Sequence, residues 1–102
     1  MSFLTAYREA VEKWPGAIVL VKIGDFYEAY DDSAITLNKR FGLTLTTRCI
    51  FGGERLDMVG FPWHSFHRNI TEYVNCGYRV VVVTREGGSR TAAAIEELNG
   101  LI

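Results

Sequence analysis

The sequence predicts an α/β fold in which helices surround a single mixed β-sheet. Residues 17–23 and 80–83 are runs of apolar, largely β-branched side chains, which is typical of strands buried on both faces. Segments with apolar residues at helical spacing lie between the expected strands. Two pairs of neighbouring strands are joined by short turns and are expected to form hairpins, which disfavours a purely parallel sheet.

The expected order of elements is helix, hairpin, helix, hairpin, helix, strand and helix. Strands are expected where apolar or alternating residues run between turn signals, over residues 17–23, 26–30, 43–49, 55–60 and 78–84. Helices are expected where an apolar stripe or an Ala- and Glu-rich composition occurs, over residues 3–14, 31–41, 64–75 and 91–98.

Several residues are expected to mark the ends of these helices. Ser2 is the expected N-cap of the first helix, and Pro15 disfavours the helical conformation in the residue before it. Asp31 and Asp32 are expected to cap the second helix and to complement its dipole. Gly42 follows that helix at the position where a left-handed residue commonly ends one.

The composition is that of one globular domain, which we place over residues 1–102. Apolar residues make up 48% of the chain, and no apolar run approaches the roughly 20 residues of a membrane span. The 11 basic and 12 acidic residues nearly balance, whereas binding to nucleic acid by phosphate contacts alone usually needs a basic surplus. No signal peptide is visible and two cysteines cannot form a disulfide scaffold, so we expect free thiols and a cytoplasmic location.

Residue types that carry catalysis or bind metals do not form a specific pattern here. His64 and His67 lie one helical turn apart, but no third metal ligand has a matching spacing. Cys49 and Cys76 are expected to be small buried side chains rather than nucleophiles. The Gly-Gly pairs fit neither phosphate-loop pattern. We therefore expect no enzyme activity, bound metal, nucleotide or other cofactor.

Residues 26–30 are the most informative segment of the chain. In an extended strand, Phe26 and Glu28 project from the same face. An aromatic ring beside a carboxylate can contact an unstacked base, because the ring can wedge or stack and the carboxylate can bond to the base edge. From the residues alone, however, Phe26 is expected to belong to the core.

Five short motifs follow one another between residues 24 and 80. They are Gly-Asp-Phe-Tyr-Glu at 24–28, Tyr-Asp-Asp-Ser-Ala at 30–34, Leu-Thr-Leu-Thr-Thr-Arg at 43–48, Met-Val-Gly-Phe-Pro-Trp-His at 58–64 and Val-Asn-Cys-Gly-Tyr-Arg-Val at 74–80. Together and in this order they resemble the mismatch-recognition domain, the first domain of MutS-family DNA mismatch repair proteins. The resemblance covers roughly residues 4–86 and implies the fold of that domain.

The resemblance also implies which residues meet DNA. Phe26 resembles the phenylalanine that wedges at a mispaired or unpaired base, and Glu28 resembles the glutamate that hydrogen-bonds to that base. Arg48 and Met58 match positions near the DNA around the lesion. Three further matches lie in a turn, where a structural role is equally expected: Gly60, Pro62 and His64.

The chain departs from the family pattern in two places. Tyr30 directly precedes Asp31, so the chain is expected to be one residue shorter here than many family members. After Glu86 the usual continuation into a connector domain is missing, and the lever, clamp and Walker A lysine do not follow. The chain is therefore expected to be either a part of a larger protein or a free-standing product.

Two hypotheses about function remain. The leading one is a non-enzymatic module that binds mispaired or distorted double-stranded DNA from the minor groove, weakly when isolated because its charges balance. Other repair-protein domains or a partner chain are further expected partners, and a membrane is not. The alternative is a protein-interaction or scaffold domain that keeps the fold without lesion recognition. The charge balance favours the alternative, and the Phe-x-Glu motif favours the first.

Overall fold

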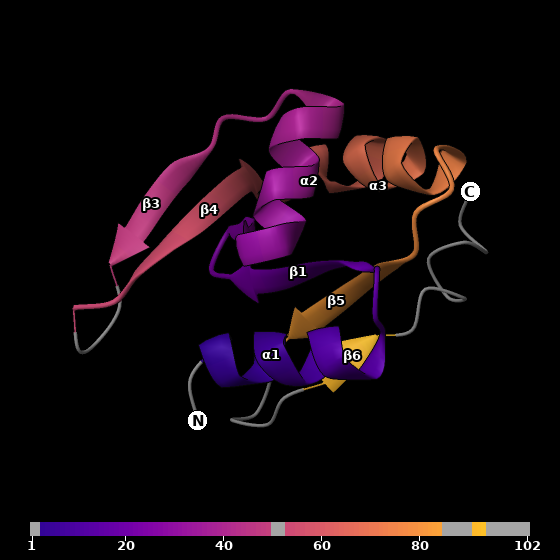
Figure 1. Ribbon diagram of the computed structural model, residues 1–102. Helices are drawn as coiled ribbons and strands as arrows, with labels where there is room; N and C mark the ends of the chain where they lie inside the picture. The colour runs from indigo at the N-terminus through magenta and orange to yellow at the C-terminus, as the bar shows by residue number, and fades with distance from the viewer. Residues whose placement is uncertain (1–2, 50–52, 85–90, 94–102) are drawn as a thin grey trace.

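A six-stranded sheet organises the part of the chain that the structure, a computed structural model, describes: residues 3–49, 53–84 and 91–93 (Figure 1). The strand order is β3-β4-β2-β1-β5-β6. The strands are β1 (Ile18–Ile23), β2 (Phe26–Tyr30), β3 (Thr46–Cys49), β4 (Arg55–Pro62), β5 (Val80–Thr84) and β6 (Thr91–Ala93). The helices are α1 (Phe3–Lys13), α2 (Asp31–Phe41), the 3-10 turn η1 (Trp63–Ser65) and α3 (Phe66–Asn75).

The sheet is mixed, as the sequence predicts. β1 and β5 pair in parallel, whereas every other neighbouring pair among the described strands is antiparallel. β5 lies between β1 and β6, and the side chains of its four valines are buried. The prediction that residues 80–83 lie inside the sheet is therefore confirmed.

Alternating side chains of the strands build a core on each face of the sheet. On one face, Val19, Val21, Val81 and their neighbours pack with apolar residues of α1. On the other face, residues of the opposite parity pack with α2 and α3, among them Leu20 and Val82. Figure 1 shows the same division, with α1 on one side of the sheet and α2 and α3 on the other. Among the described residues, no helix is both long and apolar enough to span a bilayer.

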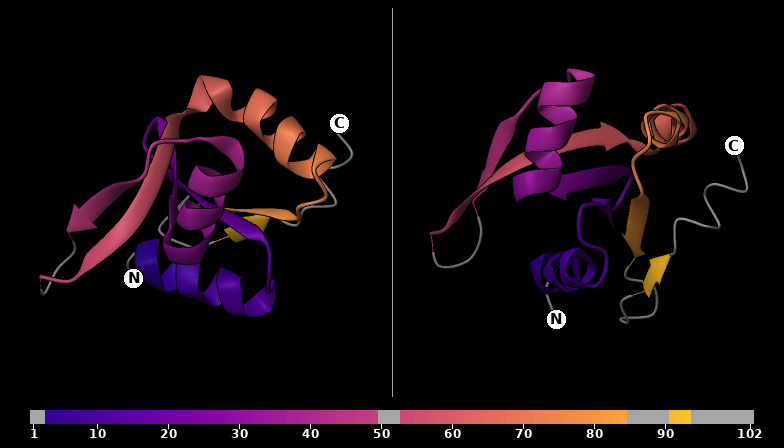
Figure 2. Two further views of the ribbon diagram at one scale, coloured as in Figure 1. Left: turned by 45° about the horizontal axis from the view of Figure 1, so that its top comes forward. Right: turned by 45° about the vertical axis from the view of Figure 1, so that its right-hand side comes forward.

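The helix α1 covers only part of its face of the sheet. It packs against β1 and β5, and the hairpin of β3 and β4 extends beyond it (Figure 2). The strands β2 and β4 therefore carry side chains that point to the α1 side of the sheet but are incompletely covered by it. This open part of the sheet contains the candidate site.

The expectation of a helix over residues 91–98 is wrong for residues 91–93. These residues form β6, which pairs antiparallel with β5 through Val82 with Ala93 and Thr84 with Thr91. An unpaired edge of β5 offers a row of backbone donors and acceptors, and pairing with it overrides the helix propensity of alanine. Residues 94–98 lie outside the described residues, as does the expected N-cap Ser2.

The start of α2 also differs from the expectation. Tyr30 is the N-cap residue, and neither Asp31 nor Asp32 makes a side-chain capping hydrogen bond there. The two carboxylates lie in the first turn, where they still complement the helix dipole. The expected end is confirmed, because Gly42 has a left-handed conformation with φ of 74° and its N–H bonds back to the last turn.

Several other boundaries shift by a few residues. The third strand begins at Thr46 rather than at residue 43, because its pairing with β4 begins at Met58, and Leu43 and Leu45 pack against the core beside α2 instead. The helix expected over residues 64–75 begins as the 3-10 turn η1 and becomes α-helical at Phe66.

Candidate functional site

Four residues singled out by the sequence lie on the α1 side of the sheet. On β2, Phe26 and Glu28 have the parity of Tyr30, which belongs to the core beneath α1. The Cα partner of Tyr30 on β4 is Met58, and Met58 in turn pairs with Thr46 on β3. Arg48 follows Thr46 by two positions and therefore projects from the same face. The sheet thus places Phe26, Glu28, Arg48 and Met58 on one face.

Phe26 is exposed, which corrects the expectation from the residues alone that it belongs to the core. Its exposed fraction is 49%, large for an apolar side chain. It opens β2 directly after a two-residue turn in which Gly24 has φ of 56°, and the backbone N–H of Trp63 donates to the carbonyl of Asp25 at 2.7 Å. The turn is therefore tied to the end of β4, and Phe26 is held in place while its ring faces solvent.

Glu28 is held by two hydrogen bonds that end on one carboxylate oxygen. The Arg48 guanidinium donates from Nη1 to Oε1 at 2.8 Å, and the Tyr30 hydroxyl donates to the same Oε1 at 2.5 Å. Only 12% of the Glu28 side chain is exposed, compared with 34% for Arg48. The carboxylate is therefore fixed beside Phe26 on the same strand.

Tyr30 is itself firmly anchored. It is fully buried, its ring meets that of Tyr7 edge to face with centroids 5.4 Å apart, and its carbonyl accepts a hydrogen bond from the Tyr7 hydroxyl. Burial, and next the hydrogen bond to Glu28, raise the pKa of Tyr30 well above its ordinary value, so the hydroxyl stays a donor. Sequence patterns did not mark Tyr30 as part of the site, although it lies two positions beyond Glu28 on the same strand face.

Met58 and Gly60 line the part of β4 next to these residues. Met58 is half-buried and packs against the core beneath α1. Gly60 is the exposed Cα partner of Glu28, and a Cβ added to it would make only ordinary contacts, 3.6 Å from the Tyr27 carbonyl oxygen and 3.7 Å from Glu28 Cγ. At Gly60 the sheet therefore presents bare backbone beside the carboxylate.

Comparison with known proteins assigns this arrangement to a family. The sequence matches the family described as MutS domain I over residues 1–98. The chain belongs to the MutS domain I family. It is 37% identical over 76 residues to the DNA mismatch repair protein MutS of Salinibacter ruber and 38% identical over 80 residues to that of Aquifex pyrophilus, covering 74% and 78% of this chain.

A third relative shows the same relationship over a longer stretch. The DNA mismatch repair protein MutS of Geobacillus sp. is 33% identical over 89 residues, which is 87% of this chain. The chain spans only 8 to 10% of the length of these three relatives. The matches therefore concern this one domain of much longer proteins.

Among the described residues, the other polar groups of this MutS domain I do not converge on a second site. Cys49 and Cys76 are exposed free thiols, which corrects the expectation that they are buried. Cys49 ends the edge strand β3 and Cys76 caps α3, so neither position faces a core. His64 and His67 are exposed as well, and the described residues hold no cluster of three metal-ligating side chains.

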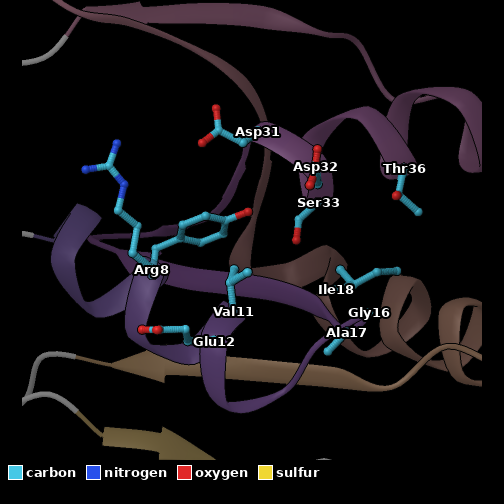
Figure 3. A pocket seen from close by; sticks show the side chains of 11 residues that line it. Arg8, Val11, Glu12, Gly16, Ala17, Ile18, Asp31, Asp32, Ser33 and Thr36 are labelled. Carbon is cyan, nitrogen blue, oxygen red and sulfur yellow. The ribbon is translucent and has the colours of Figure 1, made fainter.

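A cavity lies away from these residues, between α1 and the start of α2. Its volume is about 430 Å³, and its polar lining includes Arg8, Glu12, Asp31 and Asp32 (Figure 3). Arg8 also forms an exposed ion pair with Glu54 at 3.4 Å. None of the four residues on the open sheet face, Phe26, Glu28, Arg48 and Met58, lines this cavity.

Proposed function

We propose that this domain binds double-stranded DNA and distinguishes a mispaired or distorted site from a matched duplex through Phe26 and Glu28. The observation that carries this proposal is an exposed aromatic ring beside a fixed carboxylate on an uncovered sheet face. The names of the relatives, DNA mismatch repair protein MutS, support DNA as the partner. The role assigned to the domain is binding and not catalysis.

The chemistry of the two side chains fits a lesion rather than a matched duplex. An apolar ring that wedges between base steps unstacks them, at a cost of a few kcal/mol for a paired step. A mispaired step is already less well stacked and more deformable, so the same wedge costs less there. A carboxylate oxygen can then accept a hydrogen bond from an N–H group on the unpaired edge of the base.

The other two residues of the open face have supporting roles in this proposal. Arg48 meets DNA chiefly through Glu28, because its guanidinium is bonded to that carboxylate. Met58 provides a half-buried thioether next to them, a soft apolar surface for a sugar or base edge. The net charge of −1 leaves no bulk attraction to phosphates, so the isolated domain is expected to bind weakly.

The decisive experiment compares Phe26→Ala with a matched control, Trp63→Ala. Trp63 is also a large exposed aromatic, with an exposed fraction of 57%, but it lies outside β2. Affinities for a matched duplex and for the same duplex with one mismatch are measured at a single salt concentration. Phe26→Ala is expected to erase the mismatch preference, since base–aromatic stacking contributes about 1–3 kcal/mol. Trp63→Ala is expected to keep it.

Glu28→Ala is expected to behave differently from Phe26→Ala. Removing the carboxylate takes a negative charge away from the phosphates and breaks the ion pair of Arg48. Binding to all duplexes should therefore rise, while the difference between mismatched and matched DNA shrinks. Equal losses of affinity for Glu28→Ala and Phe26→Ala on both duplexes would contradict this assignment of roles.

The alternative function is a protein-interaction or scaffold domain. Two observations favour it: the balanced charge and the exposed apolar rings of Phe26 and Trp63, which can contact a protein. A wild-type domain that binds mismatched and matched duplexes equally, across the measurable range, would replace the DNA proposal with this alternative.

A further inference from the structure

We infer that Tyr30 and Arg48 are positioning residues for Glu28, which fix the carboxylate oxygen that an unpaired base meets. The inference rests on the proposed function and deepens it. Both hydrogen bonds that the described residues donate to this carboxylate end on Oε1, from the Tyr30 hydroxyl at 2.5 Å and from Arg48 Nη1 at 2.8 Å. Oε2 is thereby the oxygen presented to a ligand.

Tyr30 is suited to this task because it cannot turn away. Its side chain is fully buried, and Tyr7 packs on its ring while donating a hydrogen bond to its carbonyl. A buried tyrosine with one fixed hydroxyl gives the neighbouring carboxylate a single preferred orientation. Glu28 therefore does not have to give up freedom when it meets a base, which lowers the entropic cost of that contact.

Arg48 is the second residue that constrains the Glu28 side chain, and its positive charge compensates the charge of the carboxylate. Its guanidinium comes from β3 and reaches across the face of β4 to Glu28 on β2. An uncompensated carboxylate brought close to a phosphate backbone would repel it, whereas a carboxylate in an ion pair carries less net charge. Arg48 thus lets an acidic group approach DNA.

The surroundings of Glu28 leave one side open to a ligand. Its Cα partner Gly60 is exposed and has no side chain, and the Glu28 side chain retains an exposed fraction of 12%. Phe26 lies two residues earlier on the same strand face. A base displaced by the ring would therefore reach the carboxylate along the strip of sheet that Phe26, Glu28 and Gly60 define.

The test is a double-mutant cycle on the 102-residue chain, with Tyr30→Phe made in the wild type and in Glu28→Ala. The readout is the ratio of affinities for mismatched and matched duplex at one salt concentration, with thermal unfolding measured for each variant. In the wild type, Tyr30→Phe is expected to lower the ratio by roughly 3- to 10-fold, the scale of one lost hydrogen bond of ordinary strength. In the Glu28→Ala background it is expected to change the ratio by less than about twofold.

Arg48 provides the second cycle, which also serves if Tyr30→Phe does not fold. Arg48→Gln is expected to lower the ratio in the wild type only, and Arg48→Lys, which keeps the charge, is expected to recover part of it. A loss of thermal stability without a change in the ratio would show a merely structural role and overturn the inference. An equal effect of the substitutions with and without Glu28 would overturn it as well.

The same measurements separate this inference from the proposed function. A wild-type domain that prefers the mismatch, with a ratio insensitive to Tyr30→Phe and Arg48→Gln, overturns the positioning role alone. A wild-type domain without any preference overturns the proposed function, and the positioning role falls with it.

Discussion

The backbone of Asp31 carries strain at the junction of β2 and α2. Its φ of 47° places it in the left-handed region, the only described residue other than glycine to do so. That conformation costs an L-residue roughly 1–2 kcal/mol.

Replacing Asp31 with glycine should relieve this strain. Asp31→Gly is expected to raise the free energy of unfolding by about 0.5–1 kcal/mol, because the relief exceeds the entropic cost of a glycine. Asp32→Gly is the matched control, since Asp32 lies in the same helical turn with no positive φ, and it should lose roughly 0.3–1 kcal/mol, chiefly the interaction of its carboxylate with the helix dipole. Chemical denaturation measures both, and equal losses would contradict the assignment of strain to Asp31.

The charge of Asp31 leads to a separate prediction about pH. Burial raises the pKa of Asp31 above its ordinary value of 3.8, with Arg8 opposing and Asp32, Asp57 and Glu54 adding to the rise. A carboxyl whose pKa is raised by folding destabilises the native state when ionised, and this penalty disappears as the pH falls below the unfolded-state pKa.

Asp31→Asn removes the charge but keeps a residue that tolerates a left-handed conformation. The variant is therefore expected to be more stable than the wild type at pH 7, and the difference should shrink as the pH falls toward 3.8 and below. Urea denaturation across this range tests the sign. A gain in stability that stays constant with pH would point to the backbone rather than the charge.

At the same scale, the sequence predicts part of the candidate site. Strand alternation correctly places Phe26 and Glu28 on one face of β2. The same alternation places Tyr30 on that face, although the sequence did not mark Tyr30 as part of the site. The ion pair between Glu28 and Arg48 joins residues 20 positions apart and depends on β4 lying between β2 and β3. The exposure of Phe26 depends on how far α1 extends over the sheet, and residue types alone do not predict that extent.

At the scale of the elements, the hydrophobic pattern predicts most strands and helices well. An element that depends on its pairing partner is predicted poorly. The strand over residues 26–30, the interior position of residues 80–83 within the strand expected over 78–84, and the first three helices are confirmed because each has a strong apolar pattern or an end signal. Residues 91–93 fail because their helix propensity is local, whereas the edge of β5 that recruits them is distant in sequence. The capping prediction fails because Tyr30 ends β2 and begins α2 without a break.

The central strand provides the stability prediction at this scale. Val81 is fully buried in β5, with β1 on one side and β6 on the other. Val81→Asp is expected to unfold the domain, since an unpaired charge in the core costs several kcal/mol of a total that is commonly about 5–15. Thr47→Lys, on the exposed edge strand β3 opposite Asp57, is the matched control and should melt much as the wild type does. A Val81→Asp variant that unfolds cooperatively at the melting temperature of the wild type would contradict the placement of Val81 in the core.

At the scale of the whole molecule, the proposed function separates the contacts that would give affinity for any duplex from those that would distinguish a mismatch. The net charge is −1, and two described arginines are already paired, Arg8 with Glu54 and Arg48 with Glu28. Under the proposed function, affinity for any duplex would therefore rest on few phosphate contacts. Discrimination would rest on Phe26 as the wedge and Glu28 as the hydrogen-bond acceptor, on the sheet face that α1 leaves uncovered.

This division predicts how binding responds to salt. Affinity for a matched duplex should fall as salt rises, because only phosphate contacts hold it and each one releases counterions, and few contacts give a shallow slope of log affinity against log salt concentration. Stacking by Phe26 and the hydrogen bond to Glu28 release none, so the ratio of mismatched to matched affinity should stay nearly constant. Fluorescence titrations between low and physiological salt measure both quantities.

Arg48 distinguishes the two kinds of contact in the same titration. A cation that neutralises a phosphate contributes about 0.9 to the slope of log affinity against log salt concentration. Because the guanidinium of Arg48 is bonded to Glu28, Arg48→Gln is expected to lower the mismatch ratio while changing that slope by much less than this amount. A slope that falls by the full contribution of one phosphate would instead place Arg48 on the DNA backbone, with Glu28 held by Tyr30 alone.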